Sequence, residues 1–303
     1  MNTNSSLLNE ITALAVSDGL LMSIYIPFAL IYVIDGTKSH PDRYSLTHVR
    51  YILALAIVSV ILHSISIWLT VTLGVFRYLL VRFPQVGAQY CNTIRAKVTV
   101  VSISVVVTLV CIPNSISYEL KSKPYNTSDN SSNACQWWVD VKADTAKDIF
   151  LFKFNLGLQA VLVKLLPCVL LTIFSVLLIR IMKDAEIRLK KLKTNDINMQ
   201  TTESSSSSYQ ARRSKRRTRM LLTVAILFLV SETPQGILTL LILTNEDYFN
   251  MYISLGDFLD IIVLINSGIN FAIYCSMSKQ FRNTFVSICY GLFLKIRIRR
   301  KTN

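Results

Sequence analysis

Residues 51–76 read YILALAIVSVILHSISIWLTVTLGVF, and this stretch contains no Asp, Glu, Lys or Arg. A helix needs roughly 20 apolar residues to cross the hydrocarbon core of a bilayer, and residues 51–76 exceed that length. Inside lipid the backbone must also satisfy its own hydrogen bonds, which a helix does. The stretch therefore predicts a transmembrane α-helix, with His63 midway along it.

Five more apolar stretches of similar length occur in the chain. The predicted spans, in order, are residues 11–34, 51–76, 98–117, 149–181, 220–243 and 253–275. A mean hydropathy of +0.45 and a charged fraction of only 17% agree with a membrane protein rather than a soluble domain. The sequence predicts an all-α fold class: a polytopic transmembrane helix bundle that forms a single domain over residues 1–303.

The formal net charge of +14 is distributed unevenly among the connections. Lys and Arg are concentrated between the second and third spans, between the fourth and fifth, and after the sixth, whereas the connection at 246–247 is acidic. This asymmetry is the positive-inside pattern of membrane proteins, and it indicates a lipid bilayer rather than nucleic acid as the partner. With an even number of spans, both termini are expected to be cytoplasmic.

Three polar segments carry candidate modification or docking sites. Sequons at Asn126 and Asn130 lie in the connection that the charge pattern places outside, where N-glycosylation occurs. Residues 183–216 are expected to form a flexible cytoplasmic loop flanked by helical extensions, and this loop is either a solvated linker or a docking and kinase-target segment. Residues 278–290 repeat apolar side chains at helical spacing, which predicts an amphipathic surface helix. Cys289 at its end is either palmitoylated or simply buried.

Ionisable and amide side chains inside the predicted spans are the candidate functional residues, because burying them in lipid is costly. They are Asp18, His63, Lys153, Lys164, Glu232, Asp257, Asp260, Asn266 and Asn270. A structural alternative is that they pair with one another, as Lys164 and Glu232 would, and hold the helices together. The sequence contains no hydrolase, P-loop or dinucleotide motif and no Cys/His metal spacing, so we expect no enzyme, cofactor or metal centre.

Three short motifs resemble those of rhodopsin-like (class A) G-protein-coupled receptors. Leu14–Asp18 is similar to the LAxxD motif of that family's second helix, Phe76–Tyr78 to the DRY motif that ends its third helix, and Asn270–Tyr274 to NPxxY. Longer strings resemble invertebrate receptors for myosuppressin and FMRFamide-type peptides, with the sex-peptide receptor group close by. These strings are Tyr25–Phe28, Ser66–Val71, Lys164–Cys168, Arg219–Leu222 and Glu232–Gly236.

The chain departs from that family's pattern at several positions. The family has seven helices, and the first has no counterpart among the six predicted spans. Phe76 replaces the acidic residue before the key arginine, Phe271 replaces the usual proline, and Glu232 stands where most of the superfamily has tryptophan. Cys135 matches one half of the family's outer disulfide, but the other position, near Ile52, has no Cys. We therefore expect no disulfide there, with Cys135 free or in an intermolecular bond.

The resemblance implies three sets of functional residues in a multi-pass plasma-membrane receptor for a neuropeptide, signalling to a heterotrimeric G-protein. The peptide, whose arginine would favour a buried carboxylate, would meet His63, Lys164, Glu232, Gln235, Asp257 and Asp260. A sodium ion or water cluster, or else a plain hydrogen-bond network, would lie among Asp18, Ser66, Asn266 and Asn270. The residues facing the G-protein would be Arg77, Tyr78 and Tyr274.

Two other classes of protein are open on the sequence alone. One is a truncated, non-signalling receptor paralogue or an incomplete gene product, because the first helix of the family has no counterpart. The other is a six-span transporter or channel, against which the receptor motifs count heavily.

Overall fold

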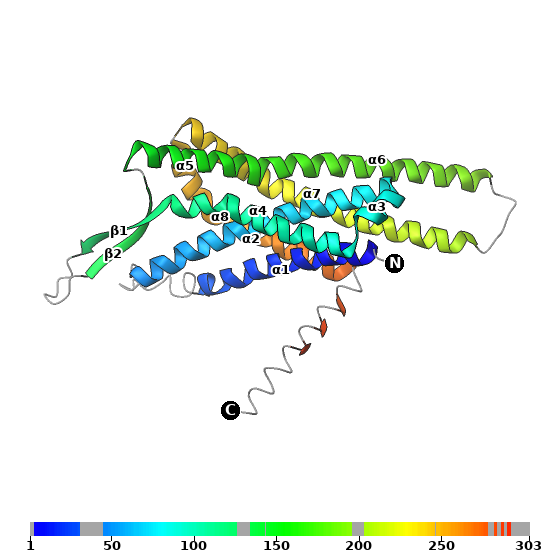
Figure 1. Ribbon diagram of the computed structural model, residues 1–303, viewed down its shortest axis with the longest axis horizontal. Coiled ribbons are helices and arrows are strands. Elements are labelled where there is room, and N and C mark those ends of the chain that lie inside the picture. Colours follow the sequence, from blue (N-terminus) through cyan, green and yellow to red (C-terminus); the bar gives the residue numbers. More distant parts are fainter. Residues whose placement is uncertain are drawn as a thin grey trace, which may run out of the picture.

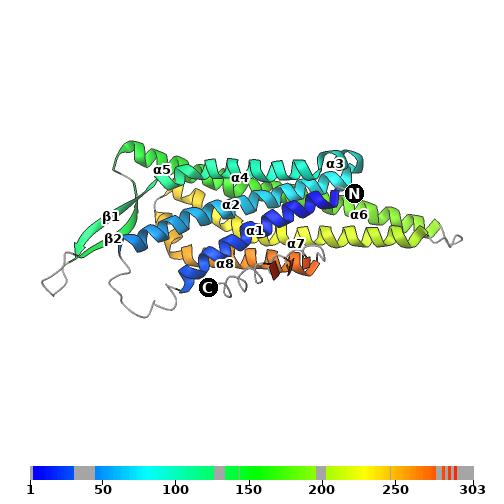
Figure 2. The same cartoon turned by 60° about the horizontal axis from the view of Figure 1, so that its bottom comes forward.

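The computed structural model describes residues 3–30, 45–125, 134–142, 144–195, 203–245 and 247–277, together with 282–283, 286–287 and 290–291. Long helices run along one axis, and a β-hairpin lies at one end of the bundle (Figures 1 and 2). The opposite end holds the start of the first helix and a short connecting helix (Figure 1). Most residues of the expected surface helix at 278–290, as well as Asn126, Asn130 and Cys289, lie outside the described residues.

The elements follow one another along the chain as antiparallel helices with a single hairpin between the fourth and fifth. They are α1 Thr3–Ala29, α2 Leu46–Arg82, α3 Pro84–Tyr90, α4 Thr93–Ile116, β1 Tyr118–Tyr125, β2 Ala134–Val141, α5 Ala146–Leu158, the π-helical segment η4 Gln159–Leu165, α6 Leu166–Asn195, α7 Glu203–Thr244 and α8 Asp247–Met277.

Five helices of the described chain are long and apolar enough to cross a membrane by length and composition, and six if one bent pair counts as a single span. The bent pair is Asn250–Gly256 and Phe258–Ile273, which meet at 45° within α8. The helical, polytopic architecture predicted from the apolar stretches is therefore confirmed.

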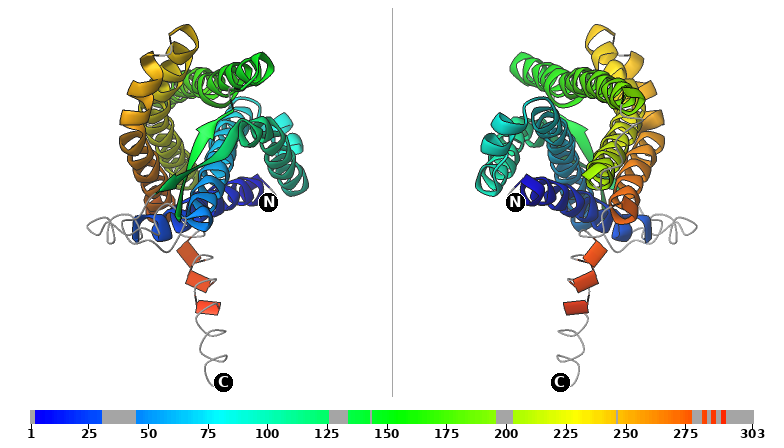
Figure 3. Two further views of the ribbon diagram at one scale, coloured as in Figure 1. Left: turned by 90° about the vertical axis from the view of Figure 1, so that its left-hand side faces the viewer. Right: turned by 90° about the vertical axis from the view of Figure 1, so that its right-hand side faces the viewer.

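Helix α2 lies near the middle of the bundle, where it packs against α1, α4, α6 and α7 (Figure 3). Its start is fixed by Ser45, whose side chain accepts a hydrogen bond from the His48 backbone N–H at 3.4 Å. It ends at Arg82, and Pro84 then opens α3, because proline lacks an N–H and suits a first helical position. Residues on α2 can thus contact nearly every other helix.

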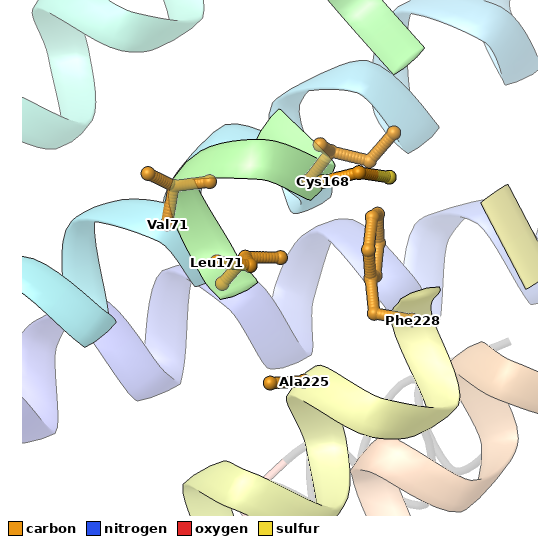
Figure 4. Packing of buried hydrophobic residues seen from close by; sticks show 6 residues of the cluster. Val71, Cys168, Leu171, Ala225 and Phe228 are labelled. Carbon is orange, nitrogen blue, oxygen red and sulfur yellow. The ribbon is translucent and has the colours of Figure 1, made fainter. Parts of the chain in front are cut away.

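An apolar cluster joins α2, α6 and α7 at mid-bundle. Its buried members are Ile67, Val71, Cys168, Leu171, Ala225 and Phe228. Figure 4 shows Val71 on one side, with Cys168, Leu171 and Phe228 directed toward the same space. Because lipid tails are as apolar as these side chains, close packing rather than removal from water holds the helices here.

The structure extends several helices beyond the predicted spans. Helical backbone continues through Asn195 and resumes at Glu203, so the helical extensions expected on both sides of the loop cover most of residues 183–216. Lys, Arg, Glu and Leu, which are strong helix formers, dominate 180–193, and their propensity favours continuing the helix into water. Residues 196–202 lie outside the described residues.

The hairpin β1–β2 lies in the connection between α4 and α5, where the sequence predicted no strands. The strands are antiparallel, with Lys121 opposite Trp138 and Pro124 opposite Cys135. The Lys121 Nζ lies 2.9 Å from Glu119 Oε1 and 3.1 Å from Asp140 Oδ2, so one ammonium links both strands. Cys135 is exposed and its thiol is free.

Candidate functional site

A buried charged cluster, hereafter the Glu232 cluster, joins three helices in the apolar bundle. His63 Nε2 of α2 lies 2.8 Å from Glu232 Oε1 of α7, and Lys164 Nζ of η4 donates to Glu232 Oε2 at 2.8 Å. The Lys164 ammonium also donates to Gln235 Oε1, one helical turn after Glu232. The Glu232 side chain is 0% exposed and that of Lys164 is 20% exposed. Four of the predicted ligand-binding residues therefore meet in one network.

Two local features of the backbone bring Lys164 to Glu232. Lys164 lies in η4, a π-helical segment, and such segments occur often at functional sites. Gly236 lets α7 approach η4 closely, since a Cβ there would lie 2.9 Å from Leu165 Cδ2 and 3.2 Å from Lys164 Cβ. Gly236 ends the string Glu232–Gly236, which resembles the peptide receptors. The sequence does not predict its packing role, because the contact joins segments that are distant in the chain.

Phe228 lies one helical turn before Glu232. It connects the Glu232 cluster with the apolar cluster that joins α2, α6 and α7. Its ring stacks on the His63 imidazole with a centroid distance of 6.4 Å and an interplanar angle of 22°. Phe228 is 2% exposed. The imidazole is therefore held on one side by an aromatic ring and on another by a carboxylate, which fixes its orientation.

Asp260 belongs to a second, more accessible polar contact. The Tyr25 hydroxyl of α1 donates to Asp260 Oδ2 of α8 at 3.2 Å, and Asp260 is exposed. Lys164 interacts electrostatically with Asp260 and with Tyr252, which places these groups around the same region of the bundle. The sequence singled out Tyr25 only as part of the string Tyr25–Phe28, which resembles the peptide receptors. The side chain of Asp257, one turn earlier on α8, lies outside the described residues.

Asp18 forms a third cluster deeper in the bundle. The Ser66 hydroxyl of α2 donates to Asp18 Oδ1 at 2.6 Å, and the Asn270 and Ser267 side chains of α8 also approach the Asp18 carboxyl group. Asp18 Oδ2, Asn266 Oδ1 and Asn270 Oδ1 are buried and have no hydrogen-bond partner among the described residues. Carboxylate and amide oxygens in this arrangement fit either a hard cation or a bridging water. Ser267 was missed by the sequence analysis.

At the other end of α2, Arg77 is buried with 6% exposure. Phe76, which stands where the family has an acid, packs with Leu80 against the apolar pair Leu7 and Leu73. Tyr78 lies against Phe174 of α6 with ring centroids 5.9 Å apart. The substitution of an acid by Phe76 thus fits an apolar contact between α1 and α2. The side chain of Tyr274 lies outside the described residues.

The comparison with protein families matches residues 4–291 to the serpentine type 7TM GPCR chemoreceptors called Srw. The chain belongs to this family. The prediction of a G-protein-coupled receptor is confirmed, while its rhodopsin-like class remains a prediction. Membership in a receptor family also agrees with the expectation that the chain is not an enzyme, and it counts against a transporter or channel.

Three curated relatives resemble the chain over most of its length. The G-protein coupled receptor dmsr-1 of Caenorhabditis elegans is 28% identical over 95% of this chain and 62% of its own length. The sex peptide receptor of Drosophila melanogaster is 28% identical over 76% of this chain and 52% of its own length. The sex peptide receptor-related protein 2 of Caenorhabditis elegans is 26% identical, over 74% of this chain and 51% of its own length. The chain therefore spans between half and two thirds of these relatives.

Proposed function

We propose that the chain is a receptor for an extracellular neuropeptide of the FMRFamide or myosuppressin type and passes the signal to a heterotrimeric G-protein. The observation that carries the proposal is the concentration of charge in an otherwise apolar bundle. His63, Lys164, Glu232 and Gln235 meet at its centre, and Asp260 lies exposed nearby. Intramembrane ionisable groups mark binding sites more often than they serve as inert packing. The names of the relatives support a peptide as the ligand.

Within this proposal, Asp260 is the acidic group that a ligand cation meets first. Glu232 is fully buried and is already paired with Lys164 and His63, so a further cation would have to displace one of them. Asp260 is exposed, and the neutral Tyr25 hydroxyl donates a hydrogen bond to its carboxyl group. A charge-assisted pair between Asp260 and a peptide arginine would leave the Glu232 cluster intact. Asp257 and Gln235 remain candidate contacts for the rest of the peptide.

Signalling requires a second face of the molecule, at the end opposite the hairpin. Arg77 and Tyr78 lie at the inner end of α2, and Tyr274 lies near the end of α8. We assign these three residues to the G-protein interface. Both termini and the basic connections would be cytoplasmic, the hairpin would face outward with glycans at Asn126 and Asn130, and Cys289 would carry palmitate at the plasma membrane.

The Asp18 cluster has two assignments in this scheme. The unpartnered oxygens of Asp18, Asn266 and Asn270 fit a sodium ion, and they fit a water-mediated network equally well. The two assignments differ in one measurable respect, because only a bound ion makes agonist affinity depend on sodium concentration.

The proposal is tested by expressing the chain in cells and measuring calcium and cyclic-AMP responses to FMRFamide- and myosuppressin-type peptides. Asp260→Asn is expected to lower peptide potency by about 10- to 100-fold, because a charge-assisted bond of roughly 1.5–3 kcal/mol is lost. Ser254→Ala, on the same helix, is the matched control, since the Asn250 backbone carbonyl is the only hydrogen-bond partner of its hydroxyl among the described residues. Unchanged potency in both Asp260→Asn and Glu232→Gln would exclude the acidic anchor. Absence of any peptide response from receptors at the cell surface would favour a non-signalling receptor.

A further inference from the structure

The Glu232 carboxylate has a partner from another helix at each of its two oxygens. Lys164 and His63 contact the two different oxygens of Glu232, so both sides of the carboxylate are occupied by groups from separate elements. His63 comes from α2, Lys164 from η4 and Glu232 from α7. One side chain of α7 therefore fastens that helix to two neighbours at the same level of the bundle.

The exposure of the three side chains is unequal. Glu232 is 0% exposed, the His63 side chain 11% and the Lys164 side chain 20%. A ligand that reaches this level meets the ammonium before it meets the carboxylate. Lys164 uses two of its three N–H donors on Glu232 and Gln235 among the described residues, so a third donor can bond a ligand acceptor.

The position of the contact along α7 makes it mechanically important. Pro234 lies two residues after Glu232 inside α7. Proline removes a backbone hydrogen bond and creates a place where a helix bends. A contact that fixes α7 beside such a bend determines the direction of the half of α7 on the inner side. Weakening the contact would allow this half to move.

Resting on the proposed function, we propose that Lys164, Glu232 and His63 form an interhelical lock that holds α7 in the non-signalling position. A hydrogen-bond acceptor of the ligand, such as a carbonyl or carboxylate oxygen, opens the lock by binding Lys164. The ammonium then shares its donors between Glu232 and the ligand, and the bond between η4 and α7 weakens. The ligand shifts the equilibrium because it binds Lys164 better when α7 has moved.

Two double variants test the lock without leaving a lone buried charge. Lys164→Met with Glu232→Gln removes the pair while keeping both side chains near their original size. Lys164→Glu with Glu232→Lys exchanges the charges and retains a pair. Ser231→Ala is the matched control on α7, because in the described part of the chain the Ser231 hydroxyl bonds only the Phe228 carbonyl of its own helix. All four receptors are compared for basal G-protein activation per receptor at the cell surface, without ligand.

The neutral double variant is expected to raise basal activation by about fivefold or more, a coupling typical of switches between two states. Ser231→Ala should stay within about twofold of wild type, a change below the usual range of such couplings. The exchanged variant should show less basal activation than the neutral variant, because it retains an ion pair between η4 and α7. The neutral variant should also gain less from Phe-Met-Arg-Phe-amide, since it lacks the ammonium that meets the acceptor. Wild-type basal activity in the neutral variant overturns the lock, and so does its retention inside the cell, which would make the pair a requirement for folding.

The outcome separates the lock from the proposed function. A wild-type receptor that responds to peptide, combined with an unchanged basal level in the neutral variant, removes the lock and leaves the receptor function standing. A complete lack of G-protein activation by every surface-expressed variant, with and without peptide, removes the proposed function itself.

Discussion

Lys164 and Lys121 each contact more than one acceptor, and the surroundings of the two lysines differ. Lys164 is held by Glu232 and Gln235 inside the bundle, next to a carboxylate that is 0% exposed. Lys121 is held by Glu119 and Asp140 on the hairpin, where its side chain is 38% exposed. Water screens the exposed ion pairs of Lys121 more strongly than the buried pair of Lys164 and Glu232. Ion pairs with similar distances therefore differ in interaction energy. The comparison teaches that burial, rather than distance, decides which pair matters.

The largest expected effect is the loss of one partner from the buried pair. Lys164→Met leaves the Glu232 carboxylate buried beside His63 alone, and we expect it to destabilise the protein by about 3–5 kcal/mol. Thermal unfolding of the purified receptor in detergent measures this change. Addition of Glu232→Gln should recover most of the loss, because the unpaired charge is then removed. Equal stability of the single and double variants would contradict the buried-charge interpretation.

An intermediate effect is expected from the glycine that permits this contact. Gly236→Ala places a methyl group against Leu165 and Lys164, and overpacking of this kind costs about 1–3 kcal/mol. The same thermal unfolding measurement applies. Gly19→Ala is the control, because an added Cβ there meets nothing within 4 Å in the described structure. If both substitutions had the same effect, helix propensity rather than close packing would explain them.

The smallest expected effect concerns the exposed pair on the hairpin. Lys121→Met should change overall stability little, because exposed ion pairs contribute weakly. Hydrogen exchange of residues 118–141, corrected for intrinsic rates, should report a local loosening only. A global change in unfolding temperature would show that the hairpin contributes more than its screened ion pairs.

The hairpin pairs also set a pH window. The hydrogen bond from Lys121 lowers the pKa of Asp140, and the bonds to Glu119 and Asp140 raise the pKa of Lys121. The Asp140 contribution is present above its unfolded pKa of about 4 and disappears as pH falls through its lowered folded pKa. The Lys121 contribution is present below about pH 10 and is lost as pH rises through its raised folded pKa. Protection of the hairpin should therefore stay constant between about pH 5 and 9, and a strong change within that range would contradict it.

Much of the fold was predictable because lipid imposes one strong rule on the backbone. The lengths of residues 51–76 and of the other apolar stretches were enough to predict membrane-spanning helices. The structure confirms a polytopic helical bundle. Helix ends were less predictable, since α6 and α7 continue beyond the apolar stretches on helix-forming polar residues. The hairpin was missed because strand pairing joins residues separated by a connection and leaves no apolar run.

The sequence predicted four members of the candidate site and one of its contacts, the pairing of Lys164 with Glu232. His63, Lys164, Glu232 and Gln235 were identified because charge in lipid is rare, and the structure brings them together. From the resemblance, Glu232 was expected to bind a ligand, and its pairing with Lys164 was the structural alternative. Only the fold reveals that the Glu232 side chain is buried between His63 and Lys164, whereas the Asp260 residue is exposed. Tyr25 and Ser267 carried no signal because their roles depend on contacts between distant helices.

The π-helical segment η4 has a consequence for any systematic mutagenesis of this receptor. Each extra residue in a helical turn rotates the following side chains by about 100° relative to an uninterrupted α-helix. A helical-wheel projection drawn continuously from Ala146 to Asn195 would therefore place the residues before Gln159 on a false azimuth. Scanning data on this span should be plotted as two wheels, one for Ala146–Leu158 and one for Leu166–Asn195.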